Sequence, residues 1–158
     1  MGGAVALTFA IDHPDLIRQL VLFDTGAKLG VLPEILGGLA GAPLNVIERV
    51  ITPKSFYKLD PNLARTARRA LSLSNPAIFF NDYNACNEFD VRPRLPEISA
   101  ETLVMCGESG EMTPPKWSHY LNAKIPNSKV FFVKEAGHMA PIEKPDACAR
   151  VLSDFLSR

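Results

Sequence analysis

Short, continuous apolar runs constrain the fold of this chain more than any other feature. The three runs are Gln19–Phe23 (QLVLF), Thr102–Gly107 (TLVMCG) and Lys129–Val133 (KVFFV). The first is bounded by Pro14 and by "DTG", which is typical of a strand buried on both faces. After Pro96 the predicted order is strand, helix, strand, helix. That order indicates an α/β fold in which right-handed crossovers join parallel strands.

Two further stretches are predicted to be helical. The residues from Gly2 to Ile11 are small or apolar, and Pro14 ends this helix. The stretch over residues 30–96 contains no strand-like run, and its short helical segments begin near prolines, which suit the first turn of a helix.

The domain organisation follows from this pattern. We expect residues 1–29 and 97–158 to form an α/β core and residues 30–96 to form an all-helical insertion.

The composition argues against several classes of protein. Lys plus Arg and Asp plus Glu each number 17 among 158 residues, so the formal net charge is zero. The chain therefore lacks the basic patches that bind nucleic acid or a membrane surface. Its apolar start has no basic leader and is too short to span a membrane. The scattered Cys86, Cys106 and Cys148 predict no disulfide framework, metal or other cofactor, and favour a cytoplasmic location.

A histidine follows the third apolar run, in "AGHMAPIEKP". Ligands bind beyond the carboxyl ends of parallel strands, so His138 stands at a typical catalytic position. Gly137 permits close approach of the backbone, and imidazole accepts and returns protons near neutral pH. His138 is therefore a candidate general base. The alternative is a loop histidine that makes an ordinary hydrogen bond.

Taken together, these segments resemble the C-terminal half of an α/β-hydrolase. "MGGAVALTFA" is similar to the residues after the nucleophilic serine of G-x-S-x-G and to the helix that follows. "TLVMCGESGEMTPP" resembles the family segment that carries the acid, and "FFVKEAGHMAPIEKPDACARVLSDFL" the segment that carries the base. The resemblance implies a partial α/β-hydrolase of about three parallel strands flanked by helices. The helical insertion takes the place of the family's cap domain.

The same resemblance implies a hydrolase that acts on an ester, a lactone or a similar small apolar substrate through an acyl-enzyme. The nucleophile, by resemblance a serine, would precede Met1 or come from a separate chain, although relatives with an Asp nucleophile share the fold. The residue after the nucleophile donates its backbone N–H to the oxyanion, and that residue is Met1 here. We therefore expect the chain to be inactive by itself.

The sequence leaves the identity of the acid open. The family pattern implies an Asp where this chain has Gly110. Glu111 and Glu108 are on the same loop and could orient the imidazole, although both also suit a solvated loop. Asp24 ends the first run, where some α/β-hydrolases carry the acid, and it also suits an Asx turn.

A non-catalytic function is the alternative. The chain would then be a degenerate hydrolase scaffold that acts as an interaction module, which Gly110 and the absence of the serine favour. In the family sheet the strand with the nucleophile adjoins the first run, so Leu20–Phe23 is expected to form an exposed apolar edge. The expected partners are a small-molecule substrate and, at this edge, a second copy or a complementing N-terminal half.

Overall fold

A three-stranded parallel sheet forms the centre of the fold. In the computed structural model, which describes residues 1–72 and 75–157, the strands are β1 (Gln19–Phe23), β2 (Glu101–Gly107) and β3 (Ser128–Val133). They pair in the order β1-β2-β3, and both pairings are parallel. The α/β class and the three parallel strands predicted from the sequence are confirmed.

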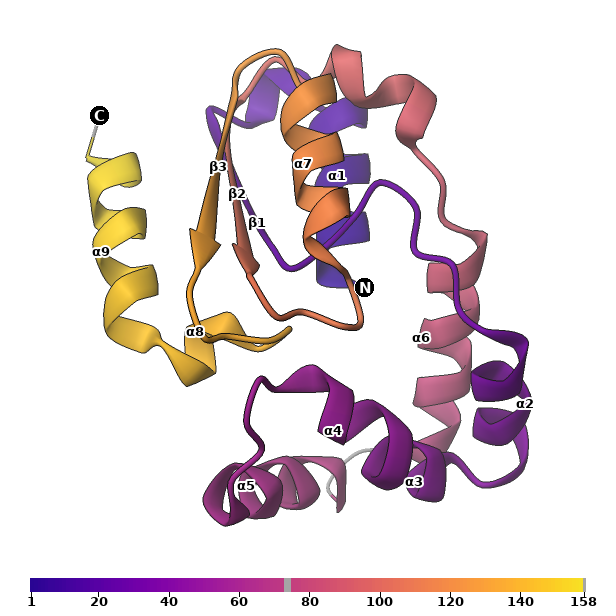
Figure 1. Cartoon of the computed structure of the whole chain (residues 1–158). Helices are drawn as coiled ribbons and strands as arrows, with labels where there is room; N and C mark the ends of the chain where they lie inside the picture. Colours follow the sequence, from indigo (N-terminus) through magenta and orange to yellow (C-terminus); the bar gives the residue numbers. More distant parts are fainter. Residues whose placement is uncertain (73–74, 158) are drawn as a thin grey trace.

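Helices lie on both faces of this sheet and beyond the carboxyl ends of its strands (Figure 1). In chain order the helical elements are α1 (Gly2–Asp12), the 3₁₀ turn η1 (Pro14–Leu16), α2 (Pro33–Gly41), α3 (Pro43–Val46), the π-helical turn η2 (Ile47–Ile51), α4 (Thr52–Ser55), α5 (Pro61–Ser72), α6 (Pro76–Glu88), the 3₁₀ helix η3 (Arg92–Glu97), α7 (Pro115–Lys124), α8 (Ala140–Glu143) and α9 (Pro145–Leu156). α1 and α7 cover one face, α9 covers the other, and α2–α6 lie beyond the carboxyl ends of the strands.

The side chains of β2 alternate between two cores. Val104 belongs to the core that includes Leu7 of α1. Met105 belongs to the core that includes Phe155 of α9. The residues from Thr102 to Gly107 are all buried, because β2 has a strand on each side and helices over each face.

β1 departs from the expectation that it is buried on both faces. Leu20 and Leu22 are buried against α1, whereas Val21 and Phe23 are half-buried. The cause is its place in the sheet, since β1 is an outer strand and pairs with β2 alone among the described residues. Association through Leu20–Phe23 stays a prediction.

The insertion over residues 30–96 has a small core of its own. Leu39, Ile47 and Ile51 form a buried cluster, against which Phe79 and Tyr83 pack. Its helices begin at or next to prolines, as the sequence predicted. The π-helical turn η2, which continues α3, was not predicted.

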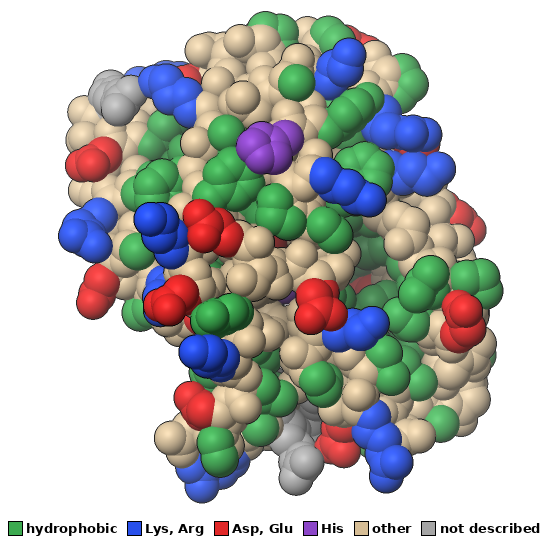
Figure 2. Space-filling model, viewed as in Figure 1, with side chains coloured by type: hydrophobic (Ala, Val, Ile, Leu, Met, Phe, Trp, Pro, Cys, Tyr) green, Lys and Arg blue, Asp and Glu red, His purple; other side chains and the backbone are tan. Residues whose placement is uncertain are grey.

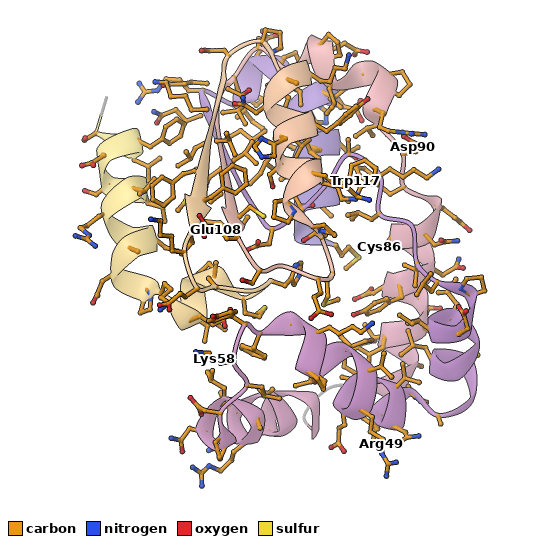
Figure 3. All side chains as sticks on the ribbon, viewed as in Figure 1. Arg49, Lys58, Cys86, Asp90, Glu108 and Trp117 are labelled. Atoms are coloured by element: carbon orange, nitrogen blue, oxygen red, sulfur yellow. The ribbon has the colours of Figure 1, made fainter. Side chains whose placement is uncertain are left out.

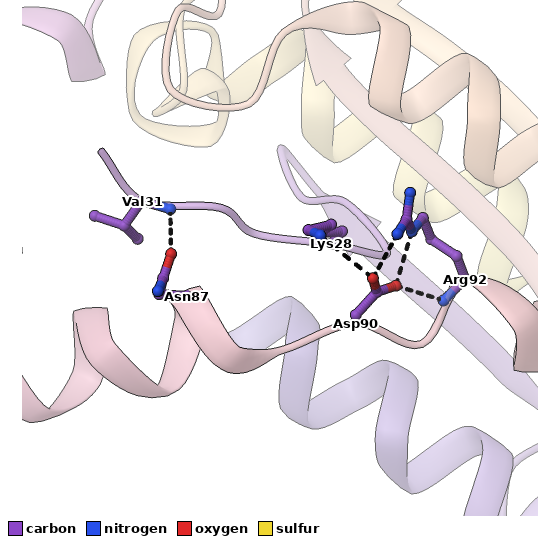
Figure 4. A network of polar contacts seen from close by, with 5 residues as sticks. All are labelled: Lys28, Val31, Asn87, Asp90 and Arg92. Atoms are coloured by element: carbon purple, nitrogen blue, oxygen red, sulfur yellow. Dashed lines mark hydrogen bonds and ion pairs between the residues drawn. The ribbon is translucent and has the colours of Figure 1, made fainter. Parts of the chain in front are cut away.

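Five residues tie together the two chain segments that join the insertion to the core (Figure 4). Lys28 and Asp90 form an antiparallel bridge, and their side chains pair at 3.6 Å. Asp90 also pairs with Arg92 at 2.6 Å, and Asn87 Oδ1 accepts the N–H of Val31 at 3.0 Å. We call these residues the stem. The stem fixes the place at which the insertion leaves and rejoins the core.

The segment after β3 also differs from expectation. The sequence predicted a loop over Lys134–Pro145, and the structure has the short helix α8 within it. Glu135 has a φ of 51°, in the left-handed region, and turns the chain just after the strand. The turn sends Ala136, Gly137 and His138 back across the end of β2.

Charged side chains of both signs are interspersed over the face shown in Figure 2. This distribution fits the formal net charge of zero. Among the helices of the described residues, none combines the length and the apolar character needed to cross a membrane.

The two glycines that begin α1 have different surroundings. A Cβ on Gly3 would lie 2.2 Å from Thr25 Oγ1, whereas a Cβ on Gly2 would meet nothing within 4 Å. α1 can therefore approach the turn after β1 only because position 3 has no side chain.

The Gly3→Ala variant should lower the free energy of unfolding by about 1–3 kcal/mol, because the new methyl group overlaps Thr25. Gly2→Ala is the matched control and should be neutral or stabilising by up to ~1 kcal/mol, since Ala favours helix over Gly. Urea denaturation followed by circular dichroism measures both. Equal effects of the two substitutions would contradict this account.

Candidate functional site

The segments that follow the three strands meet at one edge of the sheet. Asp24 comes directly after β1, and its backbone N–H donates to Met105 of β2 at 2.9 Å. Glu108, just after β2, donates its N–H to Val133 of β3 at 3.0 Å. Parallel strands end at the same edge, so residues far apart in the sequence are brought together there.

The Asp24 carboxyl group is buried at this edge. Its Oδ1 accepts the backbone N–H of Gly107 at 2.8 Å, and its Oδ2 has no hydrogen-bond partner among the described residues. The residue is only 3% exposed. Burial raises the pKa of Asp24 from 3.8 to about 6, although the bond from Gly107 opposes the shift.

The backbone of Asp24 is also in an uncommon conformation. Its φ of 41° lies in the left-handed region, which Asp tolerates better than most residues. A buried carboxyl with an unpaired oxygen on such a backbone is costly, and features of this kind gather at functional sites.

Gly110, where the resemblance implied an Asp, lies beside this carboxyl. A Cβ at Gly110 would be 3.9 Å from Asp24 Oδ1 and 3.4 Å from the carbonyl oxygens of Gly107 and Thr113. A side chain starting at position 110 would therefore begin next to the carboxyl that Asp24 already supplies.

His138 is held through Thr113. The Thr113 hydroxyl group lies 2.7 Å from the carbonyl oxygen of Asp24, to which it donates its one proton. Its oxygen lies 2.9 Å from His138 Nδ1, so it accepts from an Nδ1–H. This arrangement leaves Nε2 with its lone pair free, which is the form that a general base requires.

The surroundings of His138 favour its neutral form. Burial lowers the pKa of His138. A neutral imidazole at pH 7 is ready to accept a proton.

His138 and Thr113 line a pocket of about 470 Å³ between the core and the insertion. Most of its wall is apolar and comes from the insertion and the segment before it: Leu29, Val31, Leu32, Ile35, Val50, Ile51 and Phe79. Met1 and Glu111 also line it, as does Cys86 of α6 (Figure 3). The pocket is suited to a small molecule with an apolar part.

The other candidate acids are placed differently. Glu111 is exposed, and the described residues show no hydrogen bond or ion pair between it and His138. Glu108 is exposed, does not line the pocket, and lies on the side of the sheet that faces α9 (Figure 3). Of the three carboxyl groups considered, only that of Asp24 is buried beside the residues that hold His138.

The importance of Thr113 was missed in the sequence. The segment "TLVMCGESGEMTPP" was interpreted only as the one that carries the acid. The available signal for Thr113 was a hydroxyl residue between the end of a strand and two prolines. In the part of the chain that is described, no group of three or more His, Cys, Asp or Glu side chains could hold a metal ion.

The chain is thus an α/β protein that has a histidine, a buried carboxyl and a pocket at the carboxyl edge of a parallel sheet. The family model described as "alpha/beta hydrolase fold" matches residues 1–145. The chain therefore belongs to the α/β-hydrolase family.

Characterised relatives act as hydrolases. The chain is 26% identical to pimeloyl-[acyl-carrier protein] methyl ester esterase of Neisseria meningitidis, over 99% of this chain and 54% of the relative. It is 27% identical to 3-oxoadipate enol-lactonase 2 of Acinetobacter baylyi, over 100% of this chain and 61% of the relative.

Solved structures with the same fold include an esterase and an enol-lactonase. A thermophilic esterase matches with a TM-score of 0.86 and 31% identity, over 98% of this chain and 62% of that one. The enol-lactonase of Burkholderia xenovorans LB400 matches with a TM-score of 0.92 and 22% identity, over 100% and 63%. The chain spans 54% to 66% of the length of the first esterases it matches.

Asp24→Asn should change how stability depends on pH. The folded protein binds a proton at Asp24 more tightly than the unfolded chain does, so the free energy of unfolding falls as pH rises from about 4 through about 6. Asn keeps an oxygen for the Gly107 N–H and carries no charge. Between pH 4 and pH 8 the variant should therefore gain about 2 kcal/mol relative to the wild type.

Denaturation at several pH values measures this gain. Asp15→Asn, at an exposed residue, controls for the loss of one negative charge and should show no such gain. A constant difference between Asp24→Asn and the wild type at all pH values would show that the carboxyl is not held as described.

Thr113→Val should release the tautomer of His138. The valine has the same shape but cannot accept the Nδ1–H, so both neutral tautomers should become populated. Nitrogen-15 chemical shifts of the imidazole report this directly. Thr113→Ser retains the hydroxyl group and should keep Nδ1 protonated; an unchanged spectrum in Thr113→Val would refute the assignment.

Proposed function

We propose that the whole protein hydrolyses an ester or lactone with a small apolar part, and that His138 is its general base. The observation that carries the proposal is the geometry of His138. Its Nδ1–H is engaged by Thr113 at 2.9 Å, and its ring lines a largely apolar pocket of about 470 Å³. The family and the esterase and lactonase relatives support the same class of reaction.

In this proposal Nε2 of His138 takes the proton of a serine hydroxyl group while the serine oxygen attacks the carbonyl carbon of the substrate. The imidazolium then gives the proton to the leaving alcohol, and an acyl-enzyme remains. A water molecule then attacks the acyl carbon while His138 removes its proton. The bond between the acyl carbon and the serine oxygen breaks, the imidazolium returns the proton to the serine oxygen, and the carboxylic acid leaves. Nδ1–H stays engaged throughout, so the ring keeps its orientation.

Asp24 is proposed as the acid that stabilises the imidazolium. Two observations support this role: among the described residues its buried Oδ2 accepts no hydrogen bond within hydrogen-bond distance, and Thr113 links its backbone to the ring. A Cβ at Gly110 would lie 3.9 Å from Asp24 Oδ1, so the carboxyl from β1 lies next to the position where the resemblance implied the acid. Formation of a cation nearby would favour the ionised form of Asp24, whose pKa of about 6 is raised by burial.

The serine is proposed to precede Met1 in the whole protein. "MGG" is similar to the residues after that serine, and Met1 lines the same pocket as His138. The backbone N–H of Met1 would then lie at the start of α1 as an oxyanion donor. The insertion would act as the cap, since it supplies most of the apolar wall of the pocket.

The test is hydrolysis of p-nitrophenyl butyrate by the chain itself and by the chain extended upstream through the serine. We expect activity in the extended protein alone. His138→Ala should reduce it by about 10²–10⁴-fold, because a general base contributes that much. His119→Ala, at an exposed histidine on α7, is the matched control and should retain activity.

Other results would change the proposal. Full activity in the extended His138→Ala variant would exclude His138 as the base. Inactivity of both proteins on short and medium acyl chains would favour the non-catalytic scaffold.

A further inference from the structure

The Glu143 carboxylate joins two segments that are far apart in the sequence. Its Oε2 accepts the backbone N–H of Gly137 at 2.7 Å, and Gly137 is the residue before His138. Its Oε1 accepts the backbone N–H of Tyr57, in the insertion, at 2.6 Å. Hydrogen bonds to an ionised carboxylate are among the strongest in proteins, and here one side chain makes two.

A backbone contact runs alongside this bridge. The N–H of Met139 donates to the carbonyl oxygen of Ser55 at 3.0 Å. A Cβ on Gly137 would lie 2.6 Å from the nitrogen of Tyr57 and 2.7 Å from the carbonyl carbon of Phe56. The insertion therefore lies directly on the backbone that carries His138, at a distance that only glycine allows.

The same part of the insertion reaches the segment that carries Thr113. The Ser55 hydroxyl group lies 2.8 Å from the carbonyl oxygen of Ile51 and 3.1 Å from the sulfur of Met112. Met112 precedes Thr113 and packs against the core of the insertion. Thr113 therefore follows a residue, Met112, that contacts Ser55 at the end of α4. His138 precedes a residue, Met139, that contacts the same serine.

The insertion has a second attachment at the stem, through Lys28 and Asp90. The stem only ties the insertion to its own ends, whereas the contacts of Glu143 reach the segment of His138. Of these two attachments, only the one made by Glu143 links the insertion to the segment that carries His138, so it can couple the position of the insertion to the orientation of His138.

We propose that Glu143 is a positioning residue that makes the orientation of His138 depend on the seating of the insertion over the strand ends. When the insertion is seated, both N–H groups are engaged, and Gly137 is fixed. When it lifts, Glu143 loses Tyr57, and the segment of His138 is held less firmly. The consequence for catalysis rests on the proposed function, whereas the coupling itself does not.

The experiment is amide hydrogen exchange by NMR on the 158-residue chain. In Glu143→Ala, exchange at Tyr57 and Gly137 should be about tenfold or more faster, because both N–H groups lose their carboxylate acceptor. Exchange at Met139, whose N–H donates to Ser55 instead, should rise less, through the loosening of the segment. Glu143→Gln keeps one acceptor oxygen and should fall between wild type and Glu143→Ala. Exchange at Val104, in the centre of the sheet, should not change.

Two further measurements separate positioning from general stability. The imidazole nitrogen shifts of His138 should become those of mixed tautomers in Glu143→Ala, which a purely structural loss elsewhere would not produce. Glu135→Gln is the matched control, because Glu135 is on the same segment but is exposed, and within the described part of the chain its carboxylate pairs with Lys144 at 3.3 Å and with no other side chain. It should leave both readouts unchanged.

Unchanged exchange at Tyr57 and Gly137 in a folded Glu143→Ala variant would overturn the proposal. Equal acceleration at Val104 would overturn it as well, because the effect would then be global. Neither readout requires esterase activity, so failure of the proposed function and failure of this inference are distinguishable.

Discussion

The close stacking of three backbone segments determines how the rest of this structure can be arranged. A Cβ on Gly107, at the end of β2, would lie 2.2 Å from the carbonyl oxygen of Gly137. Gly137 in turn lies against the backbone of Phe56 and Tyr57. Strand end, histidine segment and insertion therefore form successive layers without side chains between them. Backbone groups are rigid and carry strong donors and acceptors, so this stacking leaves little freedom for the groups around it.

The polar groups around His138 depend on that stacking. Asp24, Gly107, Thr113 and His138 form one connected set of hydrogen bonds across the ends of two strands and the turn after a third. Each bond is short enough to orient its partners, and all of them are shielded from solvent to some degree. Low dielectric strengthens such a network and also makes its unpaired member, Oδ2 of Asp24, expensive. The fold thus keeps a costly group beside the residues that hold His138.

The sequence predicted the parts of the molecule that depend on local pattern. Apolar runs and turn residues located the strands, and prolines located the helices of the insertion, because these signals act over a few residues. His138 was recognised as a candidate for the same reason. The contacts of Thr113 with His138 and of Glu143 with Tyr57 were not predicted, since these partners are 25 and 86 residues away and depend on tertiary packing. The local pattern of β1 suggested burial on both faces, whereas the family resemblance correctly placed this strand at an edge of the sheet.

Asp24 and Gly110 lie 86 positions apart in the chain, yet they adjoin the same small region, since a Cβ at position 110 would lie 3.9 Å from Asp24 Oδ1. A carboxyl group could therefore enter that region from either of two strand ends while the histidine stays where it is. Such redundancy gives evolution a route for moving an acidic residue between loops, by gaining a second copy before losing the first. For this architecture, the location of a carboxyl in space is a better guide to its purpose than its position in the sequence.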